Sequence, residues 1–222
     1  MKNILVIAPH PDDEVLGAGG IIKKYSDAGF HVYILVVTRG NPKYYSEAKI
    51  INVRQEALNA HKILGVKETA FLDFFAPDLD ITPKSQISKA ISEYLIKWQI
   101  TDLYVPHLGD IHIDHRVVFE SALVASRPKG NYTVQRIFSY ETLSETEWAY
   151  PFNGYNFVPT HFVDVSDSIS YKIEALKCFK SQIRDFPDNR SLECVEALAK
   201  FRGATVGIHR AEAFVSIRTI EK

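Results

Sequence analysis

The chain has 222 residues, which suits one α/β domain with a substantial core, and its 46% hydrophobic and 12% aromatic residues are typical of a globular protein. A net charge of -1 with interspersed acids and bases offers no basic surface for nucleic acid or an anionic membrane, and two cysteines exclude a disulfide framework. Neither a signal peptide nor a membrane-spanning run is expected. We therefore predict a single domain over residues 1–222, located in the cytoplasm, that acts on a small molecule.

The first predicted element is a short apolar strand, Asn3–Ala8, whose Val and Ile residues suit a parallel sheet covered on both faces. Pro9 and Pro11 end this strand and bias the residues before them away from helix. His10 and Asp12 therefore lie on a loop at the carboxyl end of the strand. That end is where open α/β sheets bind ligands.

The loop after this first strand contains residues that could bind a metal ion. His10 and Asp13, three residues apart, can converge on one cation, because imidazole nitrogen and carboxylate oxygen both bind zinc. The three acids from Asp12 to Glu14 repel one another, and a divalent cation offsets that repulsion. The alternative is that Asp12 or Asp13 only caps the helix that begins near Val15.

The rest of the chain alternates strands with amphipathic helices, which predicts an α/β fold with a mainly parallel sheet. The expected helices are Val15–Ala28, Ser46–Leu64, Ile87–Trp98, Arg116–Ser126, Ser170–Gln182 and Leu192–Arg202. The further expected strands are His31–Thr38, Ala70–Phe75, Asp102–Pro106, Arg136–Tyr140, His161–Val165 and Phe214–Ile217. The aromatic stretch Thr142–Pro159 is predicted to be a loop that shapes a binding pocket.

A second polar cluster follows the expected strand Asp102–Pro106. His115 stands at the start of the next helix and can supply a third ligand beside the first loop, since both clusters open on the same edge of the sheet. Asp114 can hold one of the histidines by its second ring nitrogen. An isolated histidine here would more often cap a helix or pack in the core, so the metal interpretation depends on the two clusters together.

With these two motifs, the chain resembles the PIG-L/LmbE-like family of N-acetylglucosaminyl deacetylases. The resemblance is carried by His10-Pro11-Asp12-Asp13-Glu14 and by His112-Ile113-Asp114-His115. It extends through further positions along the chain: Arg54, Glu56, Tyr140-Glu141-Thr142, Ser181-Gln182 and Ala211-Glu212-Ala213-Phe214. The resemblance implies a Rossmann-like three-layer sandwich in a single domain.

The resemblance also implies a role for each matched residue. Zn²⁺, or another divalent metal such as Fe²⁺, would be bound by three ligands: His10, Asp13 and His115. Asp12 would be the general base, and His112 would face the substrate carbonyl with its imidazole oriented by Asp114. Arg54 would contact the substrate. One departure concerns Ala76, which stands about where the family often carries a sugar-binding aspartate, with Asp73 and Asp78 as candidate replacements.

The implied reaction removes an acetyl or other acyl group from the nitrogen of an N-acetylated amino sugar or its glycoside. The leaving amine needs a proton, and the sequence leaves both Asp12 and His112 open as its donor. Two other functions remain as alternatives, namely a nucleotide-dependent transferase and a non-catalytic carbohydrate-binding protein on the same fold. The identity of the sugar and the formation of a homo-oligomer also stay open.

Overall fold

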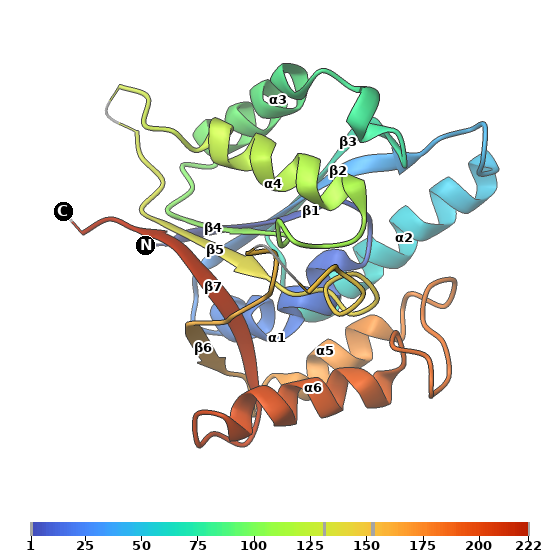
Figure 1. Cartoon of the computed structure of the whole chain (residues 1–222), viewed down its shortest axis with the longest axis vertical. Coiled ribbons are helices and arrows are strands. Elements are labelled where there is room, and N and C mark those ends of the chain that lie inside the picture. Colours follow the sequence, from blue (N-terminus) through green and yellow to red (C-terminus); the bar gives the residue numbers. More distant parts are fainter. Residues whose placement is uncertain (1, 131, 152–153, 222) are drawn as a thin grey trace.

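The computed structural model describes residues 2–130, 132–151 and 154–221, and these form one sheet in the order β3-β2-β1-β4-β5-β7-β6 (Figure 1). Neighbouring strands run parallel from β3 to β5, whereas β7 is antiparallel to both β5 and β6. The strands are β1 (Asn3–Ala8), β2 (His31–Gly40), β3 (Glu68–Ala76), β4 (Asp102–Val105), β5 (Arg136–Tyr140), β6 (His161–Asp164) and β7 (Ala211–Thr219).

Helices cover both faces of this sheet (Figure 1). One face packs against α1 (Asp13–Asp27), α2 (Glu47–Leu64), α5 (Ile169–Leu176) and α6 (Leu192–Ala204). The other packs against α3 (Lys84–Lys97) and α4 (Ile113–Ala125), with a short 3₁₀ turn, η1, at Leu79–Ile81. The predicted α/β class with a mainly parallel sheet is confirmed. Within the described ranges, no helix has the length and apolar character that a membrane span requires.

The position of β1 explains where the polar clusters meet. Alternate side chains of β1 enter the two opposite cores, so Val6 packs with one set of helices and Ile7 with the other. β1 pairs with β2 on one side and with β4 on the other, which makes it the point where the strand order reverses. The loops after β1 and β4 therefore leave the sheet side by side, at the place where doubly wound sheets bind ligands.

The C-terminal part of the chain differs from the predicted pattern. The helix expected over Ser170–Gln182 ends at Leu176, and residues 177–191 form an irregular segment before α6. Phe179, three residues beyond the end of α5, is fully buried in the core. The expected loop Thr142–Pro159 contains turns and bends in its described part, while residues 152 and 153 lie outside the described residues.

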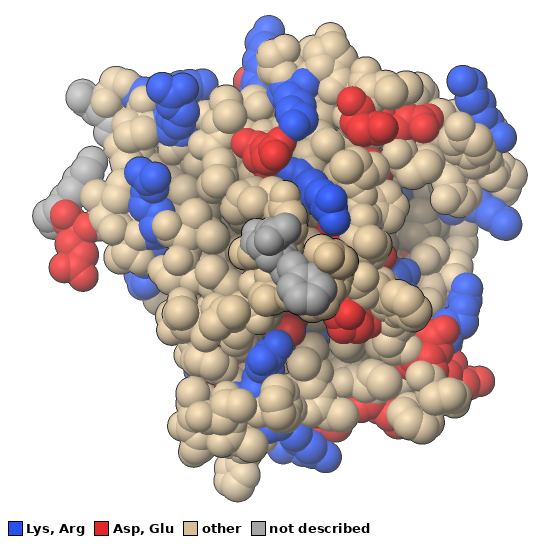
Figure 2. Space-filling view, in the orientation of Figure 1, with Lys and Arg blue, Asp and Glu red and all other residues tan. Residues whose placement is uncertain are grey.

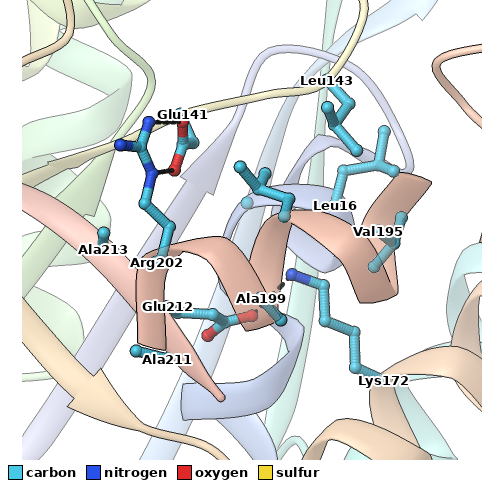
Figure 3. A pocket seen from close by; sticks show the side chains of 12 residues that line it. Leu16, Glu141, Leu143, Lys172, Val195, Ala199, Arg202, Ala211, Glu212 and Ala213 are labelled. Carbon is cyan, nitrogen blue, oxygen red and sulfur yellow. Dashed lines mark hydrogen bonds and ion pairs between the residues drawn. The ribbon is translucent and has the colours of Figure 1, made fainter. Parts of the chain in front are cut away.

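A buried ion pair joins this C-terminal part to α1. Lys172 of α5 donates to Glu212 of β7 at 2.6 Å, as Figure 3 shows, with only 6% and 4% of the two side chains exposed. The Glu212 carboxylate also accepts the backbone N–H groups of Gly20 and Ile21 at 2.8 Å each. A Cβ atom on Gly20 would lie 2.8 Å from Val165, so glycine is required for this close approach.

This geometry predicts that Glu212→Ala lowers the free energy of unfolding by about 3–5 kcal/mol, because it leaves the buried Lys172 ammonium unpaired. Urea denaturation followed by circular dichroism measures the change. The control is Lys177→Met, which removes an exposed pair with Glu174 and should change stability little. A Glu212→Ala midpoint equal to that of the unsubstituted protein would contradict the prediction.

Candidate metal centre and active site

The structure brings together the three residues that the sequence predicts as metal ligands. His10 follows β1, Asp13 opens α1 and His115 lies in the first turn of α4. Asp13 Oδ2 is 3.3 Å from His10 Nδ1 and 3.2 Å from His115 Nε2, and one ligand atom from each residue falls within 4.8 Å of the others. Sequence positions more than a hundred residues apart thus form one compact donor set.

This donor set fits a divalent metal such as Zn²⁺. Asp13 and His115 are fully buried, yet among the described residues Asp13 Oδ1 and His115 Nε2 have no hydrogen-bond partner, which is costly for buried polar atoms. His115 Nε2 and Asp13 Oδ2 are close without making a hydrogen bond. Two imidazoles and one carboxylate are a common ligand set for a catalytic zinc, whose fourth position is left to water or substrate.

Each histidine of the donor set is held by a second carboxylate. His10 Nε2 lies 3.0 Å from Asp114 Oδ2, and His115 Nδ1 lies 2.8 Å from Asp110 Oδ2. Such contacts fix the ring orientation and the tautomer of a metal-binding histidine. The Asp114 carboxylate is 4.0 Å from Nδ1 of His112, the residue it is expected to orient, and so lies closer to His10.

The carboxylates control the charge of the two imidazoles. Burial lowers the pKa of His10, but its bonds to Asp114 and Asp13 raise that pKa to about 9. Burial likewise opposes the rise in the pKa of His115, which Asp13 and Asp110 nevertheless bring well above its ordinary value. Burial raises the pKa of Asp13, but the charges of His115 and His10 bring it well below its usual range. The neighbouring carboxylates therefore favour positive charge at the His10 and His115 imidazoles.

Asp12 has an unusual backbone conformation. Its φ of 121° lies in a region that residues with a side chain rarely adopt. Its N–H donates to Glu14 Oε2 at 3.2 Å, and its carbonyl accepts from Val15 and Leu16 at the start of α1. The Asp12 side chain makes no capping hydrogen bond to α1. Burial raises the pKa of Asp12 to about 7, against the opposing charge of Arg190.

His112 caps the next helix and faces the same space as Asp12. Its Nδ1 accepts the backbone N–H of Asp114 at 3.2 Å, which makes it the N-cap residue of α4. The rings of His112 and His10 are 4.5 Å apart between centroids. Burial and the charge of His10 lower the pKa of His112 to about 4.

A cavity of about 660 Å³ opens over these residues and is lined by His10, Asp12 and His112. Its size is within the range of small-molecule sites. Its walls come from α2 and from the segment after α5, two elements that face each other on the right-hand side of Figure 1. The surface is hollowed on that side in Figure 2, and acidic and basic side chains are interspersed over the face shown.

Arg54, which is expected to contact substrate, is not among the residues that line this cavity. The residues of α2 that do line it lie in its first two turns: Ala48, Lys49, Ile50, Asn52 and Val53. Arg54 follows directly after them. Its guanidinium donates instead to the Leu72 carbonyl and the Asp73 carboxylate, both at 2.9 Å.

The segment that departs from the family pattern does border the cavity. Ala76 and Pro77 line it, whereas the two candidate replacements for a sugar-binding aspartate are engaged elsewhere. Asp73 pairs with Arg54, and Asp78 accepts from Asn41 Nδ2 at 2.5 Å. The described residues thus place no aspartate of this segment in the cavity lining.

Two residues with clear contacts at the site were not predicted from the sequence. Asp110 is fully buried between His115 and Thr146, whose hydroxyl donates to it at 2.7 Å. Its signal was its place within the histidine-rich run after β4. Arg190, whose Nη1 lies 3.0 Å from Asp12 Oδ2, comes from a polar segment with no periodicity that could have singled it out.

Comparison with known proteins agrees with this geometry. Residues 5–126, more than half of the chain, match the family described as "PIG-L: GlcNAc-PI de-N-acetylase". The chain belongs to the PIG-L family. The "Uncharacterized deacetylase YaiS" of Escherichia coli is 33% identical over 189 residues, which cover 81% of this chain and 91% of that protein.

One archaeal protein and one bacterial protein extend the similarity beyond residues 5–126. The diacetylchitobiose deacetylase of Thermococcus kodakarensis is 28% identical over 85% of this chain and 72% of its own length. A crystal structure of a conserved protein from Thermus thermophilus superposes with a TM-score of 0.81 at 25% identity, covering 100% of this chain and 97% of the other. Membership of the PIG-L family and the Rossmann-like α/β fold are thus established together.

The position of Arg54 predicts that Arg54→Met affects stability rather than substrate use. The substitution removes the bonds that join α2 to β3, so the thermal midpoint should fall, while kcat and KM stay near their original values because Arg54 does not line the cavity. Differential scanning calorimetry and steady-state kinetics measure the two effects. A several-fold rise in KM at unchanged stability would instead support the substrate contact that the resemblance implies.

Proposed function

We propose that this PIG-L family deacetylase is a zinc-dependent hydrolase that removes the acetyl group from the nitrogen of an N-acetylated amino sugar or its glycoside. The observation that carries the proposal is the convergence of His10, Asp13 and His115 beside a cavity that also contains Asp12 and His112. Zinc held by the three ligands supplies Lewis acidity toward water and the acetamide carbonyl.

Asp12 is placed to move the protons of the reaction. Its carboxylate lines the cavity next to the ligand Asp13 but is not part of the donor set. As a general base it takes a proton from the attacking water. The same carboxyl group, now protonated, can give this proton to the nitrogen of the departing amino sugar. Both transfers occur on the cavity side, where substrate enters.

His112 acts as a neutral hydrogen-bond donor in this proposal. Its Nδ1 accepts the Asp114 N–H and therefore carries no proton, so in the neutral ring the proton is on Nε2. An Nε2–H group in the cavity can stabilise the oxygen of the acetyl carbonyl as negative charge develops on it. This arrangement supports Asp12, rather than His112, as the donor of the proton to the leaving amine.

The family and the cavity support the proposed substrate class. Relatives of the chain are named as deacetylases of diacetylchitobiose and of a 2-acetamido-2-deoxyglucoside of 1D-myo-inositol, and as a probable deacetylase of N-acetylglucosaminyl L-malate. These compounds share an N-acetylated glucosamine and differ in the attached group. With Ala76 in place of an aspartate, the sugar hydroxyl groups are expected to bind through other lining residues, among them Asn52 and Gln182.

A substrate screen tests the proposed reaction. Zinc-loaded protein is incubated with N-acetylglucosamine, diacetylchitobiose and the malate and inositol glycosides, and released acetate and free amine are both measured. We expect equal amounts of the two products from at least one sugar, and no release after chelation with a recovery when zinc is restored. Binding of these sugars without release of acetate would favour the carbohydrate-binding alternative.

The two neighbouring acids are expected to respond differently to substitution. Asp13→Ala removes a metal ligand, so zinc content and activity should fall together. Asp12→Asn keeps the shape of the side chain but removes its ability to accept a proton, so zinc should stay bound while kcat falls by roughly 10²–10⁴-fold. Metal analysis by mass spectrometry and steady-state kinetics measure the two quantities.

The exposed pair of Lys177 and Glu174 provides the control, since Lys177→Met should leave both zinc content and kcat unchanged. The role assignment is refuted if Asp12→Asn purifies without zinc, or if Asp13→Ala retains both metal and activity. In either case the family assignment would remain, because it does not depend on these two roles.

A further inference from the structure

Arg190 reaches the active site from the C-terminal segment, beyond residues 5–126 that match the family. It stands directly before the N-cap residue of α6, Ser191, whose hydroxyl accepts from Cys194. The Arg190 Nη1 atom lies 3.0 Å from Asp12 Oδ2, and 20% and 3% of the two side chains are exposed. The cavity is lined by both residues.

Other contacts fix the guanidinium before any substrate enters. Arg190 Nε donates to Ser144 Oγ at 2.9 Å, and Nη1 also lies 3.4 Å from Gln182 Oε1. The backbone N–H of Arg190 donates to Asp188 Oδ1 at 2.9 Å. The planar, rigid fork of arginine makes such simultaneous bonds in one fixed orientation. These bonds therefore hold the Arg190 guanidinium in one orientation.

Asp12 has no comparable side-chain support from elsewhere. Its backbone is held by Glu14, whose second oxygen is 2.8 Å from His61 Nε2 in the core. Among the described residues, however, Arg190 is the only hydrogen-bond partner of the Asp12 carboxylate. Rotation of an aspartate carboxyl group about its last bond is otherwise loosely restricted. The Arg190 contact engages Oδ2, and within the described part of the chain Oδ1 has no hydrogen-bond partner.

We infer that Arg190 is a positioning residue, which fixes the Asp12 carboxylate in one orientation so that its second oxygen is presented to the reacting water and amine. This inference rests on the proposed role of Asp12 as general base. It assigns a catalytic contribution to the segment between α5 and α6, and predicts that loss of Arg190 disturbs the chemical step more than the binding of metal or substrate.

The test compares Arg190→Met with the unsubstituted, zinc-loaded full chain, using the sugar that is hydrolysed fastest in the substrate screen. We expect kcat to fall about 10- to 100-fold, as for a misplaced catalytic group, with KM within about twofold and zinc content unchanged. Added guanidinium ion, well below concentrations that unfold the protein, should restore part of kcat in Arg190→Met and none in Asp12→Asn.

The matched control is Arg210→Met. It breaks another arginine–carboxylate pair, between Arg210 and Glu196 of α6, and neither residue lines the cavity. It should leave kcat unchanged. A raised KM at constant kcat in Arg190→Met would make Arg190 a substrate-binding residue, and loss of zinc would make it a support of the metal site. Either result, or an unchanged kcat, overturns the inference.

A crystal structure of Arg190→Met provides a readout that does not depend on activity. The Asp12 carboxylate should then occupy more than one orientation, and a single unchanged orientation would overturn the inference. If Arg190→Met does not fold, Arg190→Lys serves in its place, because lysine keeps the charge but not the fork of bonds to Ser144 and Gln182. Absence of acetate release from the unsubstituted protein would refute the proposed function instead. The crystal structures would then still show whether Arg190 fixes the orientation of the Asp12 carboxylate.

Discussion

The Asp13 carboxylate is the contact on which the rest of the site depends. Both imidazoles approach its Oδ2 atom, and each is held from behind by a further carboxylate, Asp114 for His10 and Asp110 for His115. Burying so many charges is costly unless they compensate one another. Charges and hydrogen bonds within this group raise the pKa of each imidazole and lower the pKa of Asp13, in each case against the effect of burial. A divalent cation would meet the same need, because it would offer a partner to the buried atoms Asp13 Oδ1 and His115 Nε2.

The sequence was sufficient to predict the parts of this site that local signals encode. β1 is an uninterrupted apolar run ended by proline, and its bounds, Asn3–Ala8, are those expected. Because the carboxyl ends of parallel strands open on the same edge of a sheet, the two polar clusters could be expected together from the sequence, and β1 and β4 do pair in the structure. The proposed ligand triad was predicted from this expectation and from the preference of zinc for imidazole and carboxylate.

Other features depend on packing that no local pattern records. Arg54 was expected at the substrate, but the last residue of α2 that lines the cavity is Val53, and the Arg54 side chain is bonded to β3 instead. α5 ends at Leu176 and Phe179 is buried three residues later, a spacing that the apolar periodicity did not distinguish from continued helix. Arg190 lies in the resulting irregular segment, so its approach to Asp12 could be seen only in three dimensions.

The backbone turn at Asp12 gives two adjacent acids different surroundings. Asp13 is the first residue of α1, and its side chain turns back to accept the His10 N–H at 2.9 Å and to meet both imidazoles. A regular helical or extended conformation at Asp12 would not reverse the chain so abruptly; the φ of 121° does, and it points the Asp12 carboxylate into the cavity toward Arg190. Such strain persists only where surrounding contacts determine it, as the bonds from Asp12 to Glu14, Val15 and Leu16 do here. The strained turn therefore gives the proposed metal ligand and the proposed general base different positions within a single dipeptide.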